Sequence, residues 1–326
     1  METVNQFNYL GLLLNYNGKF FQTQKHRAQQ GRKAMFSLMS NLRKFKFNIR
    51  TQCAVFDTYV NSILSYGAEV WGFHKGPDIE KVHTCFCKNV LGVKKNTCND
   101  FIYCELGRLP LTLSRQLKII KYWLKVKNTE NIILSTCYEE MVKYNTEWIS
   151  NIKLLLDQLG LSYLWNIATK RDYCIIEQRF LDVQKQIILS NIQHSSKAVL
   201  YKYLIDNCAL QSYLQKPIEY FYIKQITRMR LCSHNLNIER GRYSNIERHN
   251  RICTFCNLNE IEDEYHFILK CPLYNDIRSK YIKQYYFKKA CVFKLVQLFS
   301  TDNVKDLRNL GKYILFSHKR RAELLM

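Results

Sequence analysis

The segment Arg251-Ile-Cys-Thr-Phe-Cys-Asn-Leu-Asn-Glu-Ile-Glu-Asp-Glu-Tyr-His-Phe-Ile-Leu-Lys-Cys271 carries the most distinctive pattern in the chain. Its soft ligands are spaced as C-x2-C-x9-H-x4-C, and they are Cys253, Cys256, His266 and Cys271. Three thiolates and one imidazole form a closed tetrahedral set for zinc. Because four protein ligands leave no open position for a substrate, the pattern predicts a structural zinc ion (Zn2+) and not a catalytic one.

The second half of this segment is expected to be helical. Glu262, Asp263 and Glu264 place carboxylates in a first helical turn, where the helix dipole favours them. His266 and Cys271 are five residues apart, which does not place them on one face of a straight helix. The following proline biases Cys271 away from the α conformation, so we expect Cys271 just past the helix end.

A chance meeting of buried cysteines is the alternative interpretation, because the chain contains 13 cysteines. Other cysteines, such as Cys85 and Cys87 or Cys98 and Cys104, form no comparable arrangement with a histidine. Four ligands within 19 residues favour zinc. The odd number of cysteines, without a charged-then-apolar leader, predicts a reducing compartment, which means an intracellular protein of the nucleus or cytoplasm that is not secreted.

The composition is that of a globular and mainly helical protein. The chain has 326 residues, of which 47% are apolar and 23% charged. This length can bury a core and predicts more than one structural unit. Only 11 glycines and 4 prolines leave little room for long irregular linkers.

The net charge of +22 predicts a polyanionic partner, and we expect RNA, DNA or both. The 22 tyrosines and 18 phenylalanines suit stacking on unpaired bases, although most of them are expected in the core. A membrane surface is the competing polyanion. No run of 18 apolar residues occurs, so we expect no membrane partner, and no motif indicates a small-molecule substrate.

The N-terminal part predicts a hairpin followed by basic helices. Residues 1–21 are expected to form the hairpin, with its turn at Asn17-Gly18 and the return strand from Phe20 and Phe21. Residues 25–46 predict a helix with many cations and no acid, which favours contact with phosphate over a merely solvated face. The candidate phosphate contacts on it are Arg27, Arg32, Lys33, Arg43 and Lys44.

Helical periodicity continues through most of the chain. Helices are expected at residues 51–66, 77–91, 101–106, 111–127, 131–143, 148–159, 173–190 and 304–316. We therefore predict a mainly α fold with an N-terminal β-hairpin, a helical bundle, a helical spacer and a small zinc-stabilised C-terminal module. The corresponding parts are residues 1–75, 76–215 and 216–326, and the middle part shows no chemistry-bearing motif.

An arginine-rich stretch leads into the first cysteine of the zinc motif. The planar guanidinium group donates two parallel hydrogen bonds and so suits phosphate. This stretch is the best candidate nucleic-acid surface near the zinc motif, and its candidate contacts are Arg228, Arg230, Arg240, Arg242 and Arg248.

Together, the two ends of the chain resemble the C-terminal portion of a non-LTR (LINE-type) retrotransposon reverse transcriptase. Phe7-Asn-Tyr-Leu-Gly11 resembles the segment that leaves the palm. The basic helices at 25–46 and 51–66, closed by Ile63-Leu-Ser-Tyr-Gly-Ala-Glu-Val-Trp-Gly72, look like the thumb. Arg228-Met-Arg-Leu231, Arg240-Gly-Arg242 and the cysteine–histidine motif resemble the C-terminal region. The middle of the chain matches only in helical character.

The chain departs from this family in its carboxylates. The resemblance implies a polymerase with paired aspartates that hold two magnesium ions, but no Asp-Asp pair occurs here. The palm and fingers are expected before Met1, so we expect no polymerase activity from this chain alone, and the missing polymerase portion is a candidate partner. A nuclease is disfavoured, because it needs clustered carboxylates. The only acidic residues after Cys271 are Asp276, Asp302, Asp306 and Glu323.

Four functional hypotheses follow from the sequence. The favoured one is a noncatalytic module that grips template RNA or target DNA through basic helices and a structural zinc module. An enzyme would need a metal-binding carboxylate cluster, which the sequence does not show. The alternative is a cellular zinc-stapled helical module for protein interaction, or a decayed element fragment without function.

Overall fold

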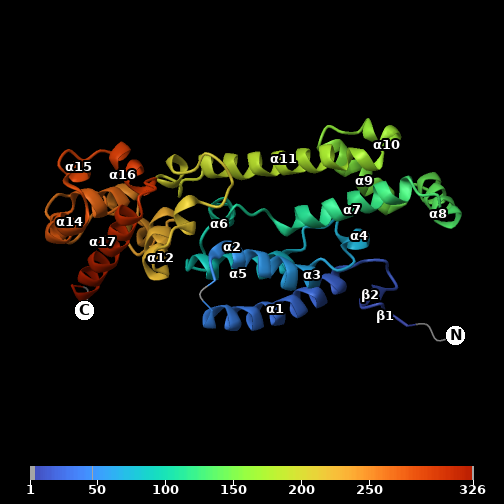
Figure 1. Cartoon of the computed structure of the whole chain (residues 1–326), viewed down its shortest axis with the longest axis horizontal. Helices are drawn as coiled ribbons and strands as arrows, with labels where there is room; N and C mark the ends of the chain where they lie inside the picture. The colour runs from blue at the N-terminus through green and yellow to red at the C-terminus, as the bar shows by residue number, and fades with distance from the viewer. Residues whose placement is uncertain (1–3, 46, 325–326) are drawn as a thin grey trace. The chain divides into compact units, whose positions relative to one another are not determined.

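The computed structural model describes residues 4–45 and 47–324, and it confirms a mainly α-helical fold with an N-terminal antiparallel hairpin (Figure 1). The chain divides into two compact units. Unit 1 takes the described residues up to Phe86 together with Leu109–Ile187, and unit 2 takes Cys87–Arg108 and the chain from Ile188 onward. The three consecutive parts expected from the sequence, 1–75, 76–215 and 216–326, stay a prediction.

In unit 1, the hairpin pairs β1 (Gln6–Tyr9) with β2 (Leu12–Asn15) in antiparallel register. Its turn consists of Leu10 and Gly11, both with positive φ, at 46° and 82°. The chain also turns at Asn17-Gly18, but the prediction that this turn joins the two strands of the hairpin is wrong. Those two residues connect β2 to the first helix, and Phe21 begins that helix instead of a return strand.

Tertiary contacts explain why the hairpin turns at Leu10-Gly11. The hydroxyl of Tyr66 donates to the Leu10 carbonyl at 2.9 Å, and the Arg27 guanidinium donates to the Gly11 carbonyl. The Thr23 hydroxyl donates to the Leu13 carbonyl on the second strand. The hairpin is thus fastened to the helices that follow it, as a hairpin too short to be stable alone requires.

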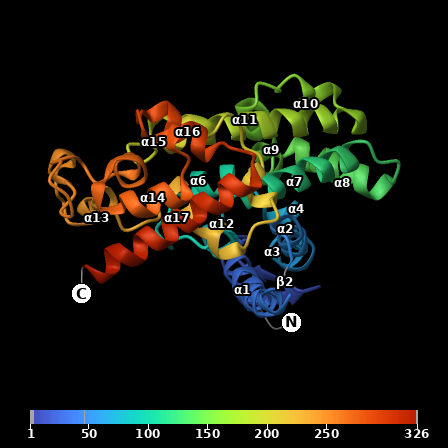
Figure 2. The same ribbon diagram turned by 60° about the vertical axis from the view of Figure 1, so that its left-hand side comes forward.

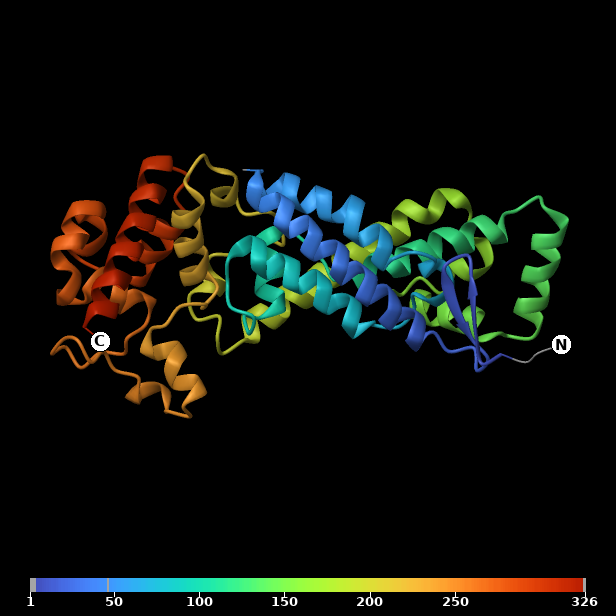
Figure 3. The ribbon, with the colours of Figure 1, turned by 90° about the horizontal axis from the view of Figure 1, so that it is seen from below.

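The rest of unit 1 is helical. Its elements are α1 (Phe21–Lys44), α2 (Ile49–Val55), η1 (Phe56–Val60), α3 (Asn61–Leu64), α4 (Ala68–Trp71), α7 (Leu111–Lys127), α8 (Ile132–Lys143), α9 (Glu147–Gln158), α10 (Leu164–Ile167) and η2 (Lys170–Asp172), and both units share α5 (Pro77–Leu91) and α11 (Tyr173–His194). Helix α1 lies alongside the α2–η1–α3 segment (Figure 3). The helix expected at 51–66 contains a wide π turn, η1. The first helix was expected to end at Lys46, which lies outside the described residues.

The core of unit 1 forms between α7, α9 and α11. Apolar side chains at helical spacing on α7, among them Leu117 and Ile120, are buried. Trp123 of the same helix stacks on Trp165 with ring centroids 5.5 Å apart. Residues 113–180, within the predicted helical spacer, therefore contribute to a packed apolar core.

Unit 2 contains the cysteine–histidine motif and is also helical. Its further elements are α6 (Asn99–Leu106), η3 (Tyr201–Tyr203), η4 (Ser212–Gln215), α12 (Tyr220–Arg230), α13 (Asn237–Tyr243), η5 (Arg248–Asn250), η6 (His266–Lys270), η7 (Pro272–Tyr274), α14 (Asn275–Tyr281), α15 (Gln284–Phe287), α16 (Val292–Phe299) and α17 (Val304–Glu323). Helices α12 and α17 lie side by side (Figure 2).

A buried polar network lies in unit 2 around Glu105, whose side chain is fully buried in α6. Its carboxylate accepts from Arg230 Nε at 2.6 Å, from the Tyr201 hydroxyl at 2.8 Å and from the Tyr213 hydroxyl at 2.7 Å. A buried carboxylate is tolerated when its charge is paired and its oxygens are hydrogen-bonded, as they are here. The network therefore ties α6 to segments about 100 residues further along the chain.

Across residues 4–45 and 47–324, no helix is both long enough and apolar enough to pass through a lipid bilayer.

Candidate metal centre

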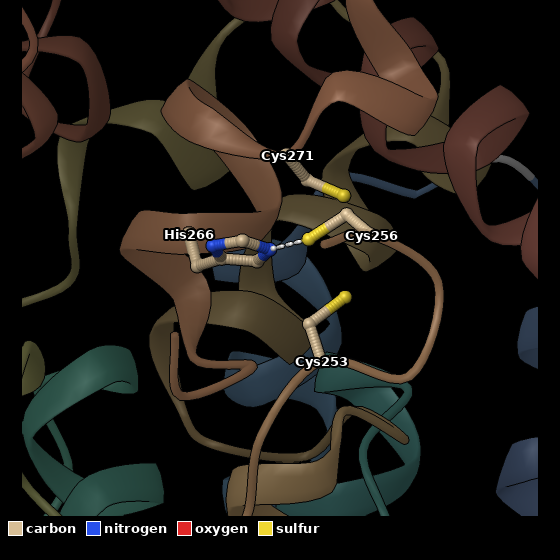
Figure 4. A group of neighbouring side chains, drawn as sticks. All are labelled: Cys253, Cys256, His266 and Cys271. Carbon is tan, nitrogen blue, oxygen red and sulfur yellow. Dashed lines mark hydrogen bonds between the residues drawn. The ribbon is translucent and has the colours of Figure 1, made fainter. Parts of the chain in front are cut away.

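The four ligand atoms predicted from the sequence converge on one point. The sulfur atoms of Cys253, Cys256 and Cys271 and a ring nitrogen of His266 all lie within 4.8 Å of one another. Figure 4 shows the three sulfur atoms and the imidazole facing a common centre. Cys253, His266 and Cys271 are buried and Cys256 is half-buried, so the group is shielded on most sides.

A short antiparallel turn positions the first two cysteines. Ile252 and Ile261 form a β-bridge, and the Cys253 amide donates to the Glu260 carbonyl at 2.8 Å. Asn259 adopts a positive φ of 51°, a conformation that asparagine tolerates better than most residues. The turn therefore directs both sulfur atoms to the same side, as the C-x2-C spacing predicts.

A wide helical turn positions the other two ligands. In η6 the Cys271 amide donates to the His266 carbonyl at 2.8 Å, a hydrogen bond across five residues that is typical of a π turn. This turn brings together two residues that a straight α-helix would separate. Cys271 has φ −52° and ψ 122°, which confirms its predicted place just past the helix end.

The three carboxylates expected in the first turn have different partners. Asp263 accepts a hydrogen bond from the His266 amide at 2.9 Å and so caps the turn. Glu264 is buried and pairs with His234 at 2.8 Å. Glu262 is also buried and accepts two hydrogen bonds from Arg321, both at 2.8 Å. Only Asp263 has the local role expected, and the other two fasten the segment to α17 and to the chain before α13.

An outer hydrogen bond orients the histidine ligand. His266 Nδ1 lies 3.1 Å from a Glu260 carboxylate oxygen, and its Nε2 lies 3.4 Å from the Cys256 sulfur. Lys270 Nζ lies 2.5 Å from the other Glu260 oxygen. A carboxylate behind a metal-binding imidazole fixes its tautomer and makes it a better ligand. Glu260 and Lys270 are neighbours of the cluster that the sequence pattern did not single out.

The thiols of the cluster differ in acidity. A hydrogen bond from Cys271 lowers the pKa of Cys253 to about 4, with a further contribution from His266. The same hydrogen bond, together with burial, raises the pKa of Cys271. Burial also raises the pKa of Cys256. In the metal-free protein one thiolate is thus stabilised by its neighbours, and binding of a metal ion would release the remaining thiol protons.

The geometry fits a small tetrahedral ion. Zinc–sulfur bonds of about 2.3 Å place tetrahedral sulfur atoms about 3.8 Å apart. The largest separation here is 4.8 Å, so closure on an ion needs side-chain shifts of about 1 Å. With all four positions filled by protein atoms, the arrangement suits a structural role.

Arginines from the C-terminal helices brace the centre. Arg278 of α14 is buried and donates to the carbonyls of Ile268 and Cys271, both at 2.8 Å. Besides its pair with Glu262, Arg321 of α17 lies with its guanidinium carbon 4.9 Å from the centre of the Phe255 ring. In the sequence both arginines look like surface charge, since their partners lie up to 59 residues away.

Of the five phosphate contacts predicted on α1, three have exposed side chains in the described structure. Arg27 is only 8% exposed, its guanidinium donates to Gln30 and Gly11, and it lies 4.6 Å from the Tyr66 ring centre. Its prediction as a phosphate contact is wrong, because it holds the hairpin in place. The side chain of Arg43 lies outside the described part of the structure. Arg32, Lys33 and Lys44 are exposed.

The second group of predicted contacts is also divided. Arg230 is 2% exposed and pairs with Glu105, so its prediction as a phosphate contact is wrong. Arg228 is half-buried and donates to the Gly92 carbonyl at 2.8 Å. Arg242 pairs with Glu239 at 2.9 Å. Arg240 and Arg248 are exposed and remain available to a partner.

No family model, curated protein or solved structure matches the chain. Assignment to a family therefore stays a proposal from the sequence motifs.

Proposed function

We propose that the chain is a noncatalytic nucleic-acid-binding module in which Cys253, Cys256, His266 and Cys271 hold a structural zinc ion. In this proposal the zinc centre holds the basic C-terminal segment in shape, and phosphate contacts come from exposed cations. The sequence motifs support a role as the C-terminal portion of a LINE-type reverse transcriptase. Such a portion would act beside a polymerase domain and would not polymerise by itself.

The observation that carries the proposal is the exposed face of α1. Lys25, Arg32, Lys33 and Lys44 are exposed on this helix, and α1 contains no acidic residue. Within the described residues, these four side chains make no ion pair or hydrogen bond with protein. Cations on an ordinary solvated helix alternate with acids, whereas a row of uncompensated cations suits the phosphates of a nucleic acid.

Aromatic side chains are available beside these cations. Phe36 lies between Lys33 and Lys44 on α1 and is 58% exposed. Phe45 and Phe47, just past the helix end, are 58% and 43% exposed. Exposed aromatic faces among phosphate-binding cations favour single strands, whose unpaired bases can stack on them. We therefore expect single-stranded RNA or DNA to bind more tightly than duplex.

A salt titration with labelled RNA and labelled DNA tests this proposal. The double variant Arg32→Gln/Lys33→Gln is expected to weaken binding about tenfold and to lower the slope of log K against log salt by about 1–2. The control is Lys81→Gln/Lys143→Gln, which removes the same charge from lysines that already pair with Asp78 and Glu140. The control should change binding less than twofold.

Metal analysis of the same protein tests the zinc centre. We expect one zinc ion per chain, retained on dialysis and removed by a strong chelator. Zinc without nucleic-acid binding at low salt would contradict the main proposal and leave a zinc-stapled module for protein interaction. Equal loss of binding in both double variants would show that only the total charge matters and not the face of α1.

A further inference from the structure

The helical spacer of unit 1 contains a second basic site, which the proposed function does not use. A cavity of about 440 Å³ lies along α7 and the start of α11. Its polar lining is dominated by four lysines, Lys118, Lys121, Lys125 and Lys170, and its walls include Tyr122 and Tyr173. Glu69 is the one carboxylate in the lining, so cations exceed acids by three.

The lysines of α7 lie close enough together to repel one another. Lys118 and Lys121 are three residues apart and Lys121 and Lys125 are four apart, so all three lie on one face of the helix. Like charges at these spacings destabilise a helix unless another charge compensates them. Lys170 adds a further cation from η2. A bound anion would remove this repulsion.

The four lysines differ in their contacts with other protein groups. Lys118 Nζ donates to the Ser65 carbonyl at 3.1 Å, and Lys121 Nζ lies 5.7 Å from the Tyr173 ring centre. In the described part of the chain, Lys125 and Lys170 have no ion-pair or hydrogen-bond partner. Three of the four, Lys121, Lys125 and Lys170, are exposed and can turn toward a ligand.

The walls supply two tyrosine rings, and the Tyr173 hydroxyl donates to a Glu177 carboxylate oxygen at 3.3 Å. Leu124 and the two tyrosines line the cavity beside the lysines. Burial and the nearby Glu177 carboxylate together raise the pKa of Tyr173 to about 12. The Tyr173 hydroxyl therefore keeps its proton at neutral pH.

We propose that this cavity binds a phosphate ester that carries a planar ring, of the size of a nucleotide. An excess of three cations suits a phosphate chain, which carries several negative charges, better than a carboxylate with one. The volume lies within the range of about 300–1,000 Å³ found for small-molecule sites. Lysine binds phosphate as a mobile point charge, and the tyrosine rings can cover a base.

Calorimetric titration of the full chain with ATP, without divalent metal, tests the site. The variant Lys121→Gln/Lys125→Gln is expected to bind ATP at least tenfold more weakly. The control Lys81→Gln/Lys143→Gln, with the same change in charge, should bind within twofold of the unmodified chain. Since Lys121 and Lys125 are exposed, the first variant should unfold at an unchanged or higher temperature, and the rise in that temperature caused by ATP should disappear.

Two further titrations identify which part of the ligand is bound. Pyrophosphate binding as tightly as ATP would overturn the role of the ring and keep the phosphate site. Adenosine binding as tightly as ATP would overturn the phosphate site. No heat and no thermal shift with any of the three, or equal loss in both double variants, would overturn the proposal as a whole.

A competition experiment separates the two sources of such a phosphate ester. Saturating single-stranded RNA that leaves ATP binding unchanged would show a site for a free nucleotide. RNA that displaces ATP, and does so in the Arg32→Gln/Lys33→Gln variant as well, would show that a nucleic-acid strand occupies this cavity. This inference does not depend on nucleic-acid binding by α1, because the two sites share no residue. If α1 does not bind nucleic acid, the ATP titrations still test the cavity.

Discussion

At the scale of single residues, positive charge in this chain has two separate roles. Arg230, Arg278 and Arg321 are buried and hold carboxylates or carbonyls inside unit 2. Arg32 and Lys33 are exposed and have no protein partner in the described structure. The net charge of +22 therefore overstates the charge available to a nucleic acid, because some of the arginines are buried and bound to other protein groups.

The adjacent residues Arg320 and Arg321 allow a matched test of this difference. Arg321→Met leaves Glu262 buried without its partner, and we expect the free energy of unfolding to fall by about 3 kcal/mol. Arg320→Met removes a pair with Asp276 that is largely solvent-exposed, and we expect a loss below about 1 kcal/mol. Urea unfolding of the zinc-loaded protein measures both. Equal losses in the two variants would contradict the assignment of Arg321 as a buried brace.

At the scale of elements, local patterns predicted the regular helices and failed where distant residues decide the backbone. The helices expected at 77–91 and 111–127 were predicted with their observed ends, because apolar residues recur at helical spacing along both segments. The hairpin turn was misplaced, since Tyr66 and Arg27 hold Leu10-Gly11 from another part of the chain. The ligand set of the centre was local and predictable, whereas its braces on α14 and α17 were not.

Two glycines at helix ends give a test at this scale. Gly107 after α6 and Gly160 after α9 have positive φ, at 63° and 68°. A Cβ on Gly107 would lie 2.4 Å from the Leu210 amide nitrogen, whereas a Cβ on Gly160 would meet nothing within 4 Å. Gly160→Ala is therefore expected to cost about 1–2 kcal/mol of unfolding free energy from its backbone conformation alone.

Gly107→Ala has the same conformational cost, and in addition its new Cβ would collide with the backbone at Leu210. Because the neighbouring segment at Leu210 cannot move without breaking its bridge to Leu106, we expect at least about 2 kcal/mol more than for Gly160→Ala. Thermal unfolding of both variants measures the difference. Similar values for the two would show that the Leu106–Leu210 contact yields easily.

At the scale of the whole molecule, the four ligands belong to unit 2 and the α7–α9 core belongs to unit 1. Removal of the metal should therefore act on part of the chain and not on all of it. Cys256→Ser is expected to abolish zinc retention and to expose residues 250–275 to protease, because a structural zinc site stabilises its own fold. Backbone amides of α7 and α9 should keep their protection from hydrogen exchange.

Cys291→Ser is the control for this experiment, since Cys291 is exposed and lies outside the cluster. It should retain zinc and the original protease pattern. Unchanged metal content or unchanged cleavage in Cys256→Ser would contradict the zinc centre. Loss of amide protection in α7 together with the zinc would show that the two units unfold as one.

The buried carboxylate of Glu105 has a consequence for the order of events during synthesis. Its partner Arg230 comes 125 residues later in the chain. A ribosome that adds about 5–20 residues per second leaves Glu105 waiting roughly 6–25 s for that arginine. Until then, burial of this carboxylate would leave its charge unpaired, so we expect α6 to stay hydrated while the intervening helices emerge. Slower translation between residues 105 and 230 would lengthen this exposed period and raise the risk of aggregation of the nascent chain.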